Sequence, residues 1–383
     1  MPLKAEEIYN SLLEWPDRAV GSEDEMMARE QLVTHLEGEP GVNVVEEALL
    51  VPSSNLPLLV AVVMAQLFAV WAASSMALIA LLTASVFWFS YILFLDGRNS
   101  PLVWLLPKKV SANLVAKKGE GKRLFIVMAH LDCAARPFLE KATFSAHKTK
   151  IFYGTLGVLS FGMFVSVFAV NEIILPNWFN VLVSMLLVCL LAISSLHIWS
   201  ARYGAKATDN LAGVTSAVTA ASQLWRRMPH NTEVRLLLTT GYGAGKLGAQ
   251  HYWQQHDEDF KYRDVFVVNV ELGGDGKLGY VAQSGPFLPI QCSNILTKTA
   301  QAAIGHNERF KGITYSKLAL EHSDAISFHH GGLPTISLCS MPYEESTGDV
   351  AFDPTEQMAL AAQMALAAQY AESIVRMTPS STH

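Results

Sequence analysis

The sequence predicts an α/β protein with a mostly parallel sheet, helices on both faces of that sheet, and two transmembrane helical hairpins inserted into it. Short β-branched and apolar runs alternate with helix-patterned stretches in the polar part of the chain, which is typical of a covered parallel sheet. Two long apolar segments interrupt that alternation. With 51% hydrophobic and 16% charged residues among 383, the composition indicates a membrane protein.

Composition also excludes several classes of protein. The net charge of −6 is modest and both signs are mixed along the polar segments, so no nucleic-acid surface is expected. The four cysteines are scattered without a Cys-x-x-Cys pair, which argues against a disulfide framework and a thiolate zinc site. The first residues are polar and acidic, and we expect no cleaved signal peptide.

Two segments, 56–95 and 151–200, predict the membrane hairpins. The first contains no charged residue, and its length allows two crossings of a hydrocarbon core that needs roughly 20 residues each. The second is divided by a link that contains Pro176 and Asn177, which suit a turn between helices. The four predicted spans cover residues 56–74, 76–95, 151–170 and 178–200. Buried core helices are the alternative, which lengths near twenty residues without charge disfavour.

The distribution of charge predicts how the chain is oriented. Lysine and arginine flank the spans on the side of the polar segments, whereas the hairpin tips carry only Glu172. By the positive-inside rule, we expect an integral membrane protein with its polar domain and both termini in the cytoplasm. His197 is almost alone as an ionisable residue within the spans, so anchoring is favoured over transport. Close helix packing and ordinary span composition explain equally well the small residues Gly154, Gly157, Ser160 and Gly162.

The polar segments 1–55, 100–150 and 201–383 are together long enough for one large α/β domain, into which the hairpins are inserted. Its strands are predicted at 44–50, 112–116, 123–129, 234–238, 265–270 and 334–338. Its later helices are predicted at 213–225, 289–304 and 355–375.

Polar residues follow several of these strands, and ligands of such sheets bind at the carboxyl ends of strands. His130 and Asp132 follow the run 123–129, and an imidazole with a nearby carboxylate is typical of a zinc ligand and the group that orients it. Glu271 follows the run 265–270. Asp209 precedes Asn210 at the start of a predicted helix, where a simple N-cap is the alternative. Each signal alone is weak, so their order along the chain matters more.

That order resembles the family of co-catalytic zinc aminopeptidases, which also includes glutaminyl cyclases and inactive relatives such as the transferrin receptor and nicalin. The matching motifs are the segments 18–22, 129–132, 209–213, 245–252, 323–328 and 332–334. The resemblance implies the family's α/β fold. It also implies that His130 binds one zinc ion and Asp209 bridges two, with Asp132 and Asp324 behind the ligands.

The remaining family positions depart from the pattern. By the resemblance, the third carboxylate position falls on Glu271 and the late histidine position on Glu345, although the last alignment stays open within 344–353. The adjacent Glu-Glu pair that supplies the general base and a ligand falls on Tyr242 and Gly243. Glycine has no side chain to coordinate a metal, and a tyrosine with a pKa near 10 is a poor base at neutral pH.

The sequence therefore favours a membrane-anchored metallopeptidase-like pseudoenzyme, inactive or strongly altered, with an interaction or assembly role. The alternative is an active zinc-dependent aminopeptidase, a hydrolase that cleaves N-terminal residues with a remodelled site, so whether the chain is an enzyme stays open. One or two zinc ions are expected only if other side chains rebuild the site. The candidates for such a rebuilt site are Asp275, Glu321, His322, His329, His330 and Glu344. Expected partners are the lipid bilayer and either peptides or another membrane protein. The sequence does not predict the oligomeric state.

Overall fold

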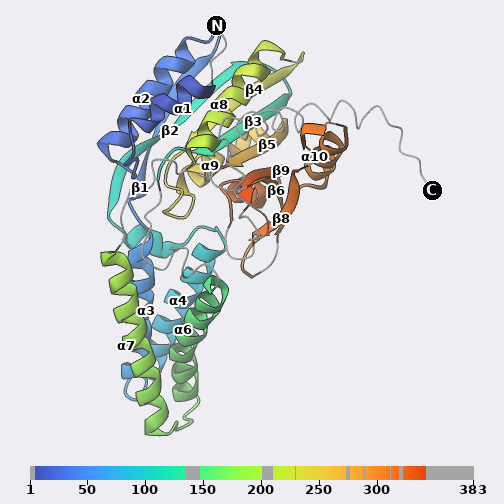
Figure 1. Ribbon diagram of the computed structural model, residues 1–383. Helices are drawn as coiled ribbons and strands as arrows, with labels where there is room; N and C mark the ends of the chain where they lie inside the picture. Colours follow the sequence, from blue (N-terminus) through green and yellow to red (C-terminus); the bar gives the residue numbers. More distant parts are fainter. Residues whose placement is uncertain are drawn as a thin grey trace, which may run out of the picture. The chain divides into compact units, whose positions relative to one another are not determined.

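A computed structural model describes the chain over most of its length. The described residues are 5–133, 147–200, 210–228, 230–272, 277–287, 290–306, 308–310, 312–318 and 322–341. The chain divides into two compact units, one α/β and one helical (Figure 1). The α/β unit consists of Met1–Ser53, Lys109–Ala134 and Gly204–His383, and the helical unit consists of Ser54–Lys108 and Ala135–Tyr203.

The α/β unit is built on a nine-stranded sheet of order β1-β2-β4-β3-β5-β9-β6-β7, in which β8 pairs with β6. The strands are β1 Asn43–Pro52, β2 Lys108–Gly119, β3 Arg123–His130, β4 Thr232–Thr239, β5 Asp264–Glu271, β6 Lys277–Ser284, β7 Ile290–Gln291, β8 Thr314–Leu318 and β9 Thr335–Met341. The four central strands β4, β3, β5 and β9 are parallel. Their neighbours β2 and β6 run antiparallel to β4 and β9.

The sheet is therefore mixed. The predicted parallel pairing is found among the four central strands and between β6 and β8, whereas the pairs β2–β4, β6–β9 and β6–β7 are antiparallel. A parallel neighbour requires a long crossover connection. The link from Gly119 to Arg123 between β2 and β3 is far too short for one, so the chain reverses direction there. No helix stands between β5 and β6 among the described residues, and β6 likewise runs against the central strands.

Helices cover both faces of this sheet, as predicted. Phe125 and Val127 of β3 point into a core shared with α1 Ala5–Leu13, α2 Glu23–Glu37, α8 Leu211–Arg226 and α10 Asn294–His306. Leu124 and Ile126 point into a second core, shared with α9 Leu247–Lys261 and α11 Ile326–His330. This alternation along one strand follows from the two-residue period of the side chains. The predicted helix at 355–375 lies outside the described residues.

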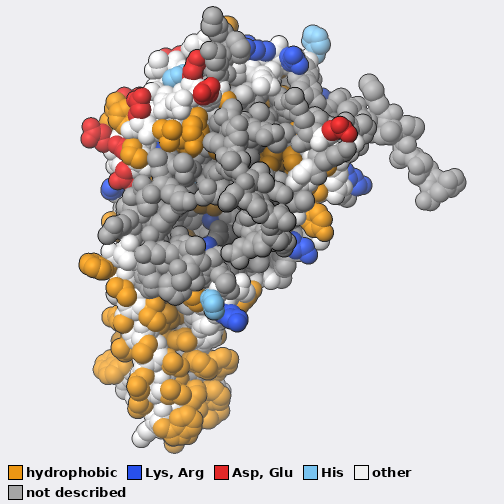
Figure 2. Space-filling view, viewed as in Figure 1, with side chains coloured by type: hydrophobic (Ala, Val, Ile, Leu, Met, Phe, Trp, Pro, Cys, Tyr) orange, Lys and Arg blue, Asp and Glu red, His pale blue; other side chains and the backbone are white. Residues whose placement is uncertain are grey.

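The helical unit contains α3 Leu56–Ala72, α4 Ala77–Leu95, α6 Lys148–Val170 and α7 Asn177–Trp199, with the short 3-10 helix η1 Pro101–Leu105 after α4. Figure 2 shows apolar side chains over much of one face of this unit, and many large apolar residues of its helices are exposed. Within the described part of the chain, α4, α6 and α7 are long and apolar enough to cross a membrane, whereas the apolar α3 has 17 residues. Three of the four predicted spans thus have the required length and composition. The fourth stays a prediction.

Polar contacts join three of these helices. The Gln66 amide of α3 donates to the Ala84 carbonyl of α4 over 3.0 Å, and Gly162 of α6 lies so close that an added Cβ would be 2.5 Å from the Gln66 Oε1. Trp88 Nε1 of α4 donates to Ser160 Oγ of α6 over 3.2 Å. The packing role proposed for the small residues of α6 therefore holds at Ser160 and Gly162. By contrast, nothing lies within 4 Å of a Cβ added at Gly154 or Gly157.

Candidate functional site

The candidate site lies where the parallel strands β3, β4 and β5 end. His130 is the last residue of β3, Thr239 of β4 and Glu271 of β5, and the register places His130 directly beside Thr239. Parallel strands present their carboxyl ends at one edge of a sheet. The residues that sequence analysis selected after separate strands therefore come together in space.

The segment before α2 positions the loop that follows β3. The side chain of Arg18 is buried, and its Nε donates to the Leu131 carbonyl over 3.1 Å. In return, the Cys133 amide donates to the Arg18 carbonyl over 2.8 Å. These contacts hold the segment that contains Asp132 against the N-terminal part of the chain.

Glu25 is a second anchor, which sequence analysis did not identify as part of the site. Its buried carboxylate accepts hydrogen bonds from the Gly21 amide over 2.6 Å, from the Ser111 hydroxyl over 2.7 Å and from the Thr240 hydroxyl. Thr240 stands just before the Gly241–Tyr242 turn, so Glu25 ties α2 to the loop after β4. Its only sequence signal was the spacing from Ser22, whose hydroxyl accepts from the Glu25 amide at the N-terminus of the helix.

Tyr242 occupies the centre of the site. Its backbone amide donates to both carboxylate oxygens of Asp132, over 3.2 and 3.1 Å. Its ring is stacked on the imidazole of His130, with centroids 4.0 Å apart and planes inclined by 11°. The Lys246 ammonium lies 4.9 Å from the centroid of the same ring, within range of a cation–π contact. Tyr242, at the position expected for the base, thus contacts His130 and Asp132, two residues that match the family motif.

One hydrogen bond of the His130 ring indicates its tautomer. Nδ1 lies 2.9 Å from the backbone carbonyl oxygen of Asp132. A carbonyl can only accept, so Nδ1 carries the proton, and in the neutral ring the lone pair lies on Nε2. It is the carbonyl of Asp132 that orients this imidazole, whereas the Asp132 carboxylate bonds the Tyr242 amide.

Three carboxyl groups are buried at this site, and Asp324 lies close enough to Asp132 and to Glu271 to raise the pKa of each. Burial raises the pKa of Asp132 to about 7, and it also raises the pKa values of Glu271 and Asp324, whereas a charged His130 lowers all three. Glu271 accepts from the Asn269 amide over 2.9 Å and from the Asp324 backbone amide over 3.1 Å. Thus Asp324 and Glu271, which follow different strands, belong to one hydrogen-bonded group.

Asn210 joins the ends of β3 and β5. Its side-chain amide donates to the His130 carbonyl over 2.9 Å, and its Oδ1 accepts from the Leu272 amide over 2.8 Å. The residue has a φ of 47°, a left-handed conformation that asparagine tolerates better than most residues. Gly213 is required beside it, because an added Cβ would lie 2.0 Å from Asn210 Oδ1. Sequence analysis named Asn210 only as part of a motif and did not predict that its side chain links the ends of β3 and β5.

The described residues do not fit a zinc centre. No group of three or more histidine, cysteine, aspartate or glutamate side chains within the described ranges converges as a metal site requires. Both Asp132 oxygens bond the Tyr242 amide, and the Tyr242 ring lies over the His130 imidazole.

Several sequence-predicted residues cannot be placed in this site. Outside the described residues lie Asp209, Asp275, Glu321, Glu344, Glu345, Asp349 and Asp353. Three substitutes are described. His322 Nδ1 lies 3.2 Å from Ser284 Oγ, while His329 and His330 end α11.

Comparison with known proteins agrees with this architecture. Residues 192–370 match the model of peptidase family M28. The aminopeptidase from Aneurinibacillus sp. strain AM-1 aligns at 13% identity over 97% of this chain and 94% of its own, with a TM-score of 0.53. A search among curated proteins finds no matching sequence.

Two further structures align with a TM-score of 0.50 and 12% identity. The zinc aminopeptidase BSAP from Bacillus subtilis covers 97% of this chain and 96% of its own. The glutaminyl cyclase from Porphyromonas gingivalis covers 97% of this chain and 99% of its own. At these identities the likeness concerns the fold. The chain therefore has the α/β fold of zinc aminopeptidases and glutaminyl cyclases, and its residues 192–370 carry the sequence pattern of peptidase family M28.

Proposed function

We propose that the chain is a membrane-anchored, aminopeptidase-like protein that does not hydrolyse peptides and serves as an interaction or assembly module. The observation that carries the proposal is the stack of Tyr242 on His130, with ring centroids 4.0 Å apart. In the family that the chain resembles, the positions that correspond to 242 and 243 hold a general base and a metal ligand. Here they hold a phenol engaged by the neighbouring imidazole and a glycine.

The chemical consequence is large. A positioned general base contributes typically about 10²–10⁴-fold to a hydrolytic rate, and a tyrosine with an ordinary pKa near 10 is almost wholly protonated at neutral pH. Gly243 offers no side-chain ligand. An aminopeptidase that loses both groups is expected to lose ordinary turnover, while Arg18, Glu25 and Asn210 still hold the loops of the fold in place.

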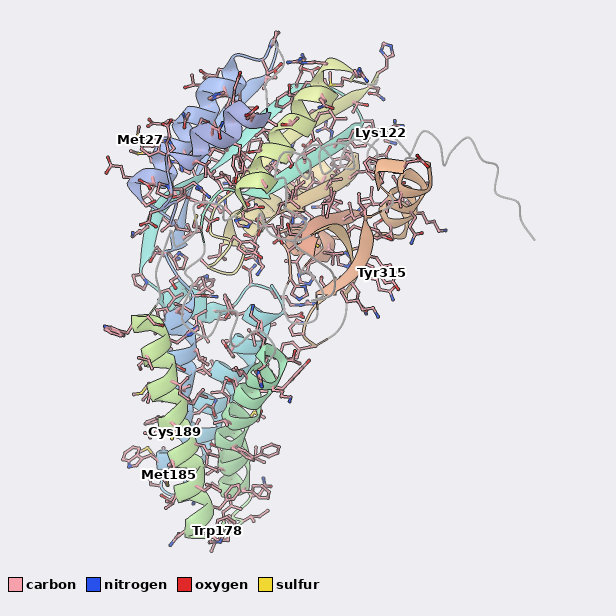
Figure 3. The ribbon with its side chains drawn as sticks, in the orientation of Figure 1. Met27, Lys122, Trp178, Met185, Cys189 and Tyr315 are labelled. Carbon is pink, nitrogen blue, oxygen red and sulfur yellow. The ribbon has the colours of Figure 1, made fainter. Side chains whose placement is uncertain are left out.

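Membrane anchoring is supported by the length and the flanks of α7. Trp178 and Trp199 are exposed near its two ends and stand 21 positions apart, about 31 Å along a helix. This spacing matches a hydrocarbon core of about 30 Å, whose two interfaces are enriched in tryptophan. Figure 3 shows Trp178, Met185 and Cys189 following one another along this helix.

The proposal includes α3 as a fourth span. Its 17 residues lie at the lower limit of the range for a membrane helix, about 17–25 residues. Four spans put all polar segments on one side of the membrane. The lysines and arginines of those segments favour the cytoplasm. On that basis the proposed partners are the lipid bilayer and either a peptide segment or another membrane protein.

One observation favours a second candidate, an active zinc-dependent aminopeptidase with a remodelled centre. The hydrogen bond from His130 Nδ1 to the Asp132 carbonyl favours the tautomer in which a histidine binds a metal through Nε2. A remodelled centre would then take its other ligands from outside the described residues, where Asp209 and Glu345 lie.

A metal and activity test separates the two candidates. The full chain is purified in detergent, incubated with zinc, freed of excess metal and assayed by elemental analysis and with a library of aminoacyl-coumarin substrates. The expected result is substoichiometric zinc and no hydrolysis above background. Zinc-dependent hydrolysis that His130→Ala abolishes would establish the second candidate instead.

Anchoring and assembly are tested separately. Resistance to alkaline carbonate extraction, with labelling of tagged termini only from the cytoplasmic side, is expected for the proposed topology. Extraction of the full chain into the aqueous phase would contradict it. Cross-linking of the intact chain in its native membrane should reveal a defined partner band, and a single band at the monomer mass under all conditions would argue against an assembly role.

A further inference from the structure

We infer that η1 is an interfacial segment, which inserts Trp104 and Leu105 into the headgroup layer of a lipid bilayer. The inference rests on the proposed membrane anchoring and adds a contact that lies outside the spans. The segment is amphipathic. Leu102 and Val103 are buried, whereas 76% of Trp104 and 69% of Leu105 are exposed.

The chain after α4 is built to hold η1 in place. Gly97, with a φ of 69°, reverses the chain, and the Arg98 amide donates to the Leu93 carbonyl over 2.9 Å. The Ser100 hydroxyl then donates to the Ser90 carbonyl over 2.7 Å, in a buried contact. Thus η1 folds back beside the last turns of α4 and does not extend away from it.

The contact with Ser90 defines the depth of η1. Ser90 stands 13 positions after Ala77, the first residue of α4, or about 20 Å along the helix, and Leu95 ends α4 about 27 Å from that start. If the hairpin tip before Ala77 marks one face of a hydrocarbon core of about 30 Å, then the Ser90–Ser100 contact at the start of η1 lies within about 10 Å of the opposite boundary.

Other aromatic residues of the helical unit belong to the same end. Trp88 of α4 bonds Ser160 of α6, and the earlier residue Ala84 of α4 is linked through Gln66 to the later residue Gly162 of α6, so these two helices are antiparallel. The start of α6 and the end of α7 therefore lie at the end of α4. Among the described residues, Tyr153, Trp104 and Trp199 are exposed aromatic side chains toward this end. A ring of such side chains is typical of a membrane interface.

The chemistry of η1 suits the headgroup layer better than water. An indole combines a large apolar body with an N–H donor, so it is satisfied where one end is apolar and the other is hydrated. Exposed Lys108 follows three residues after Leu105 and adds a cation, which favours lipid phosphates.

The test places one environment-sensitive maleimide dye at three positions in the full chain. The native Cys189 is exposed in the middle of α7 and reports on the hydrocarbon core. In a Cys189→Ser background, Trp104→Cys reports on η1. Tyr262→Cys, at the exposed end of α9, reports on water. Labelled chains are reconstituted into vesicles of phosphatidylcholine and phosphatidylglycerol.

The Cys189→Ser chain without a new cysteine serves as the labelling blank. Cys133 and Cys339 are buried, and burial raises the pKa of the Cys292 thiol to about 11, which slows its reaction. If Trp104→Cys does not yield folded protein, Leu105→Cys carries the dye from the adjacent exposed position.

We expect the dye at position 104 to emit at shorter wavelength than the dye at 262. Lipids brominated near the headgroup should quench it more than lipids brominated near the chain end, with the reverse order at Cys189. A dye at 104 that behaves like the dye at 262, while Cys189 is quenched, would overturn the role of η1 and leave anchoring intact. Absence of quenching at Cys189 would overturn the proposed anchoring and this inference with it.

Discussion

The phenol ring of Tyr242 lies flat on the imidazole of His130, with planes inclined by only 11°. The two residues are joined by tertiary structure alone, since one ends β3 and the other follows β4. A stacked aromatic pair of this kind contributes about 0.5–1.5 kcal/mol beyond the burial of its surface.

We therefore expect Tyr242→Ala to lower the free energy of unfolding by at least this amount. Tyr242→Phe retains the ring and the backbone amide that bonds Asp132, so it should lower the melting temperature less than Tyr242→Ala does. Thermal unfolding in detergent, followed by circular dichroism, measures both. Equal losses for the two variants would assign the effect to the hydroxyl group and contradict the stack as its source.

Restoring the family pair tests the proposed loss of metal binding. The double variant Tyr242→Glu with Gly243→Glu removes the stack and supplies two carboxylates at the positions where the family resemblance puts the base and a ligand. We expect it to bind more zinc than the unmodified chain, measured by elemental analysis after removal of excess metal. Tyr242→Phe is the matched control and should bind no more than the unmodified chain. Stoichiometric zinc already present in the unmodified chain would contradict the prediction.

Asn210 is expected to be essential for the edge of the sheet that forms the site. Asn210→Ala leaves the His130 carbonyl and the Leu272 amide without their partner, and each buried unsatisfied group costs roughly 1–3 kcal/mol. A matched control is Asn231→Ala, because Asn231 also has a left-handed φ, of 56°, but is exposed. Chemical denaturation should show a much larger loss for Asn210→Ala. Comparable losses would contradict the prediction, because the bond from the Lys122 amide to Asn231 Oδ1 is exposed and its loss should cost little.

Much of the α/β unit was predictable because local sequence determines it. The run at 123–129 is continuous and apolar, as a central parallel strand must be, and the observed strand β3 covers Arg123–His130. Strand β2 was predicted only at 112–116 but extends over Lys108–Gly119. The two ends of β2 are exposed and charged, so only its buried centre carries the apolar pattern that predicts a strand.

The contacts that build the site were not predictable in the same way. Residue order placed His130 and Glu271 after strands, but the bridge by Asn210 depends on the register of β3 and β5, which is a property of the whole sheet. The stack of Tyr242 on His130 likewise depends on how two loops are held by Arg18 and Glu25. None of these contacts leaves a periodic signal in the sequence.

The ion-pair network at the start of β4 predicts a pH dependence of stability. Burial raises the pKa of Glu233, but hydrogen bonds and charges from Arg235 and Arg263 outweigh this effect and lower it below its ordinary value. The same two arginines lower the pKa of Asp259, and Tyr252 bonds Arg235. A carboxyl group with a lowered pKa stabilises the fold above its unfolded-state pKa of about 4.3, and this contribution is lost as pH falls through the folded value.

Glu233→Gln should therefore destabilise the chain at pH 7 by on the order of 2 kcal/mol, and the difference should shrink below about pH 4. Denaturant titrations at both pH values measure it. Asp264→Asn is the control, because its 4.0 Å pair with Lys122 is exposed and contributes little. A Glu233→Gln effect that is the same at both pH values would show that packing, and not charge, is lost.

Gly162 in α6 gives the sharpest test of the helical unit. A Cβ added there would lie 2.5 Å from Oε1 and 3.0 Å from Cβ of Gln66, a fully buried residue that also bonds Ala84. Overpacking of this kind costs typically about 1–3 kcal/mol, so Gly162→Ala should lower the unfolding temperature in detergent. Gly157→Ala is the matched control, since nothing lies within 4 Å of its added Cβ, and helix propensity predicts a gain of up to about 1 kcal/mol.

The identity of the clashing partner can be verified in the same experiment. Gln66→Ala removes the atoms that the new methyl group meets, at the expense of the bond to Ala84. In that background, the additional loss caused by Gly162→Ala should largely disappear, because residues in contact show non-additive effects. Fully additive losses would mean that α6 does not approach α3 as closely as these contacts indicate, and that the small residue at position 162 reflects ordinary span composition.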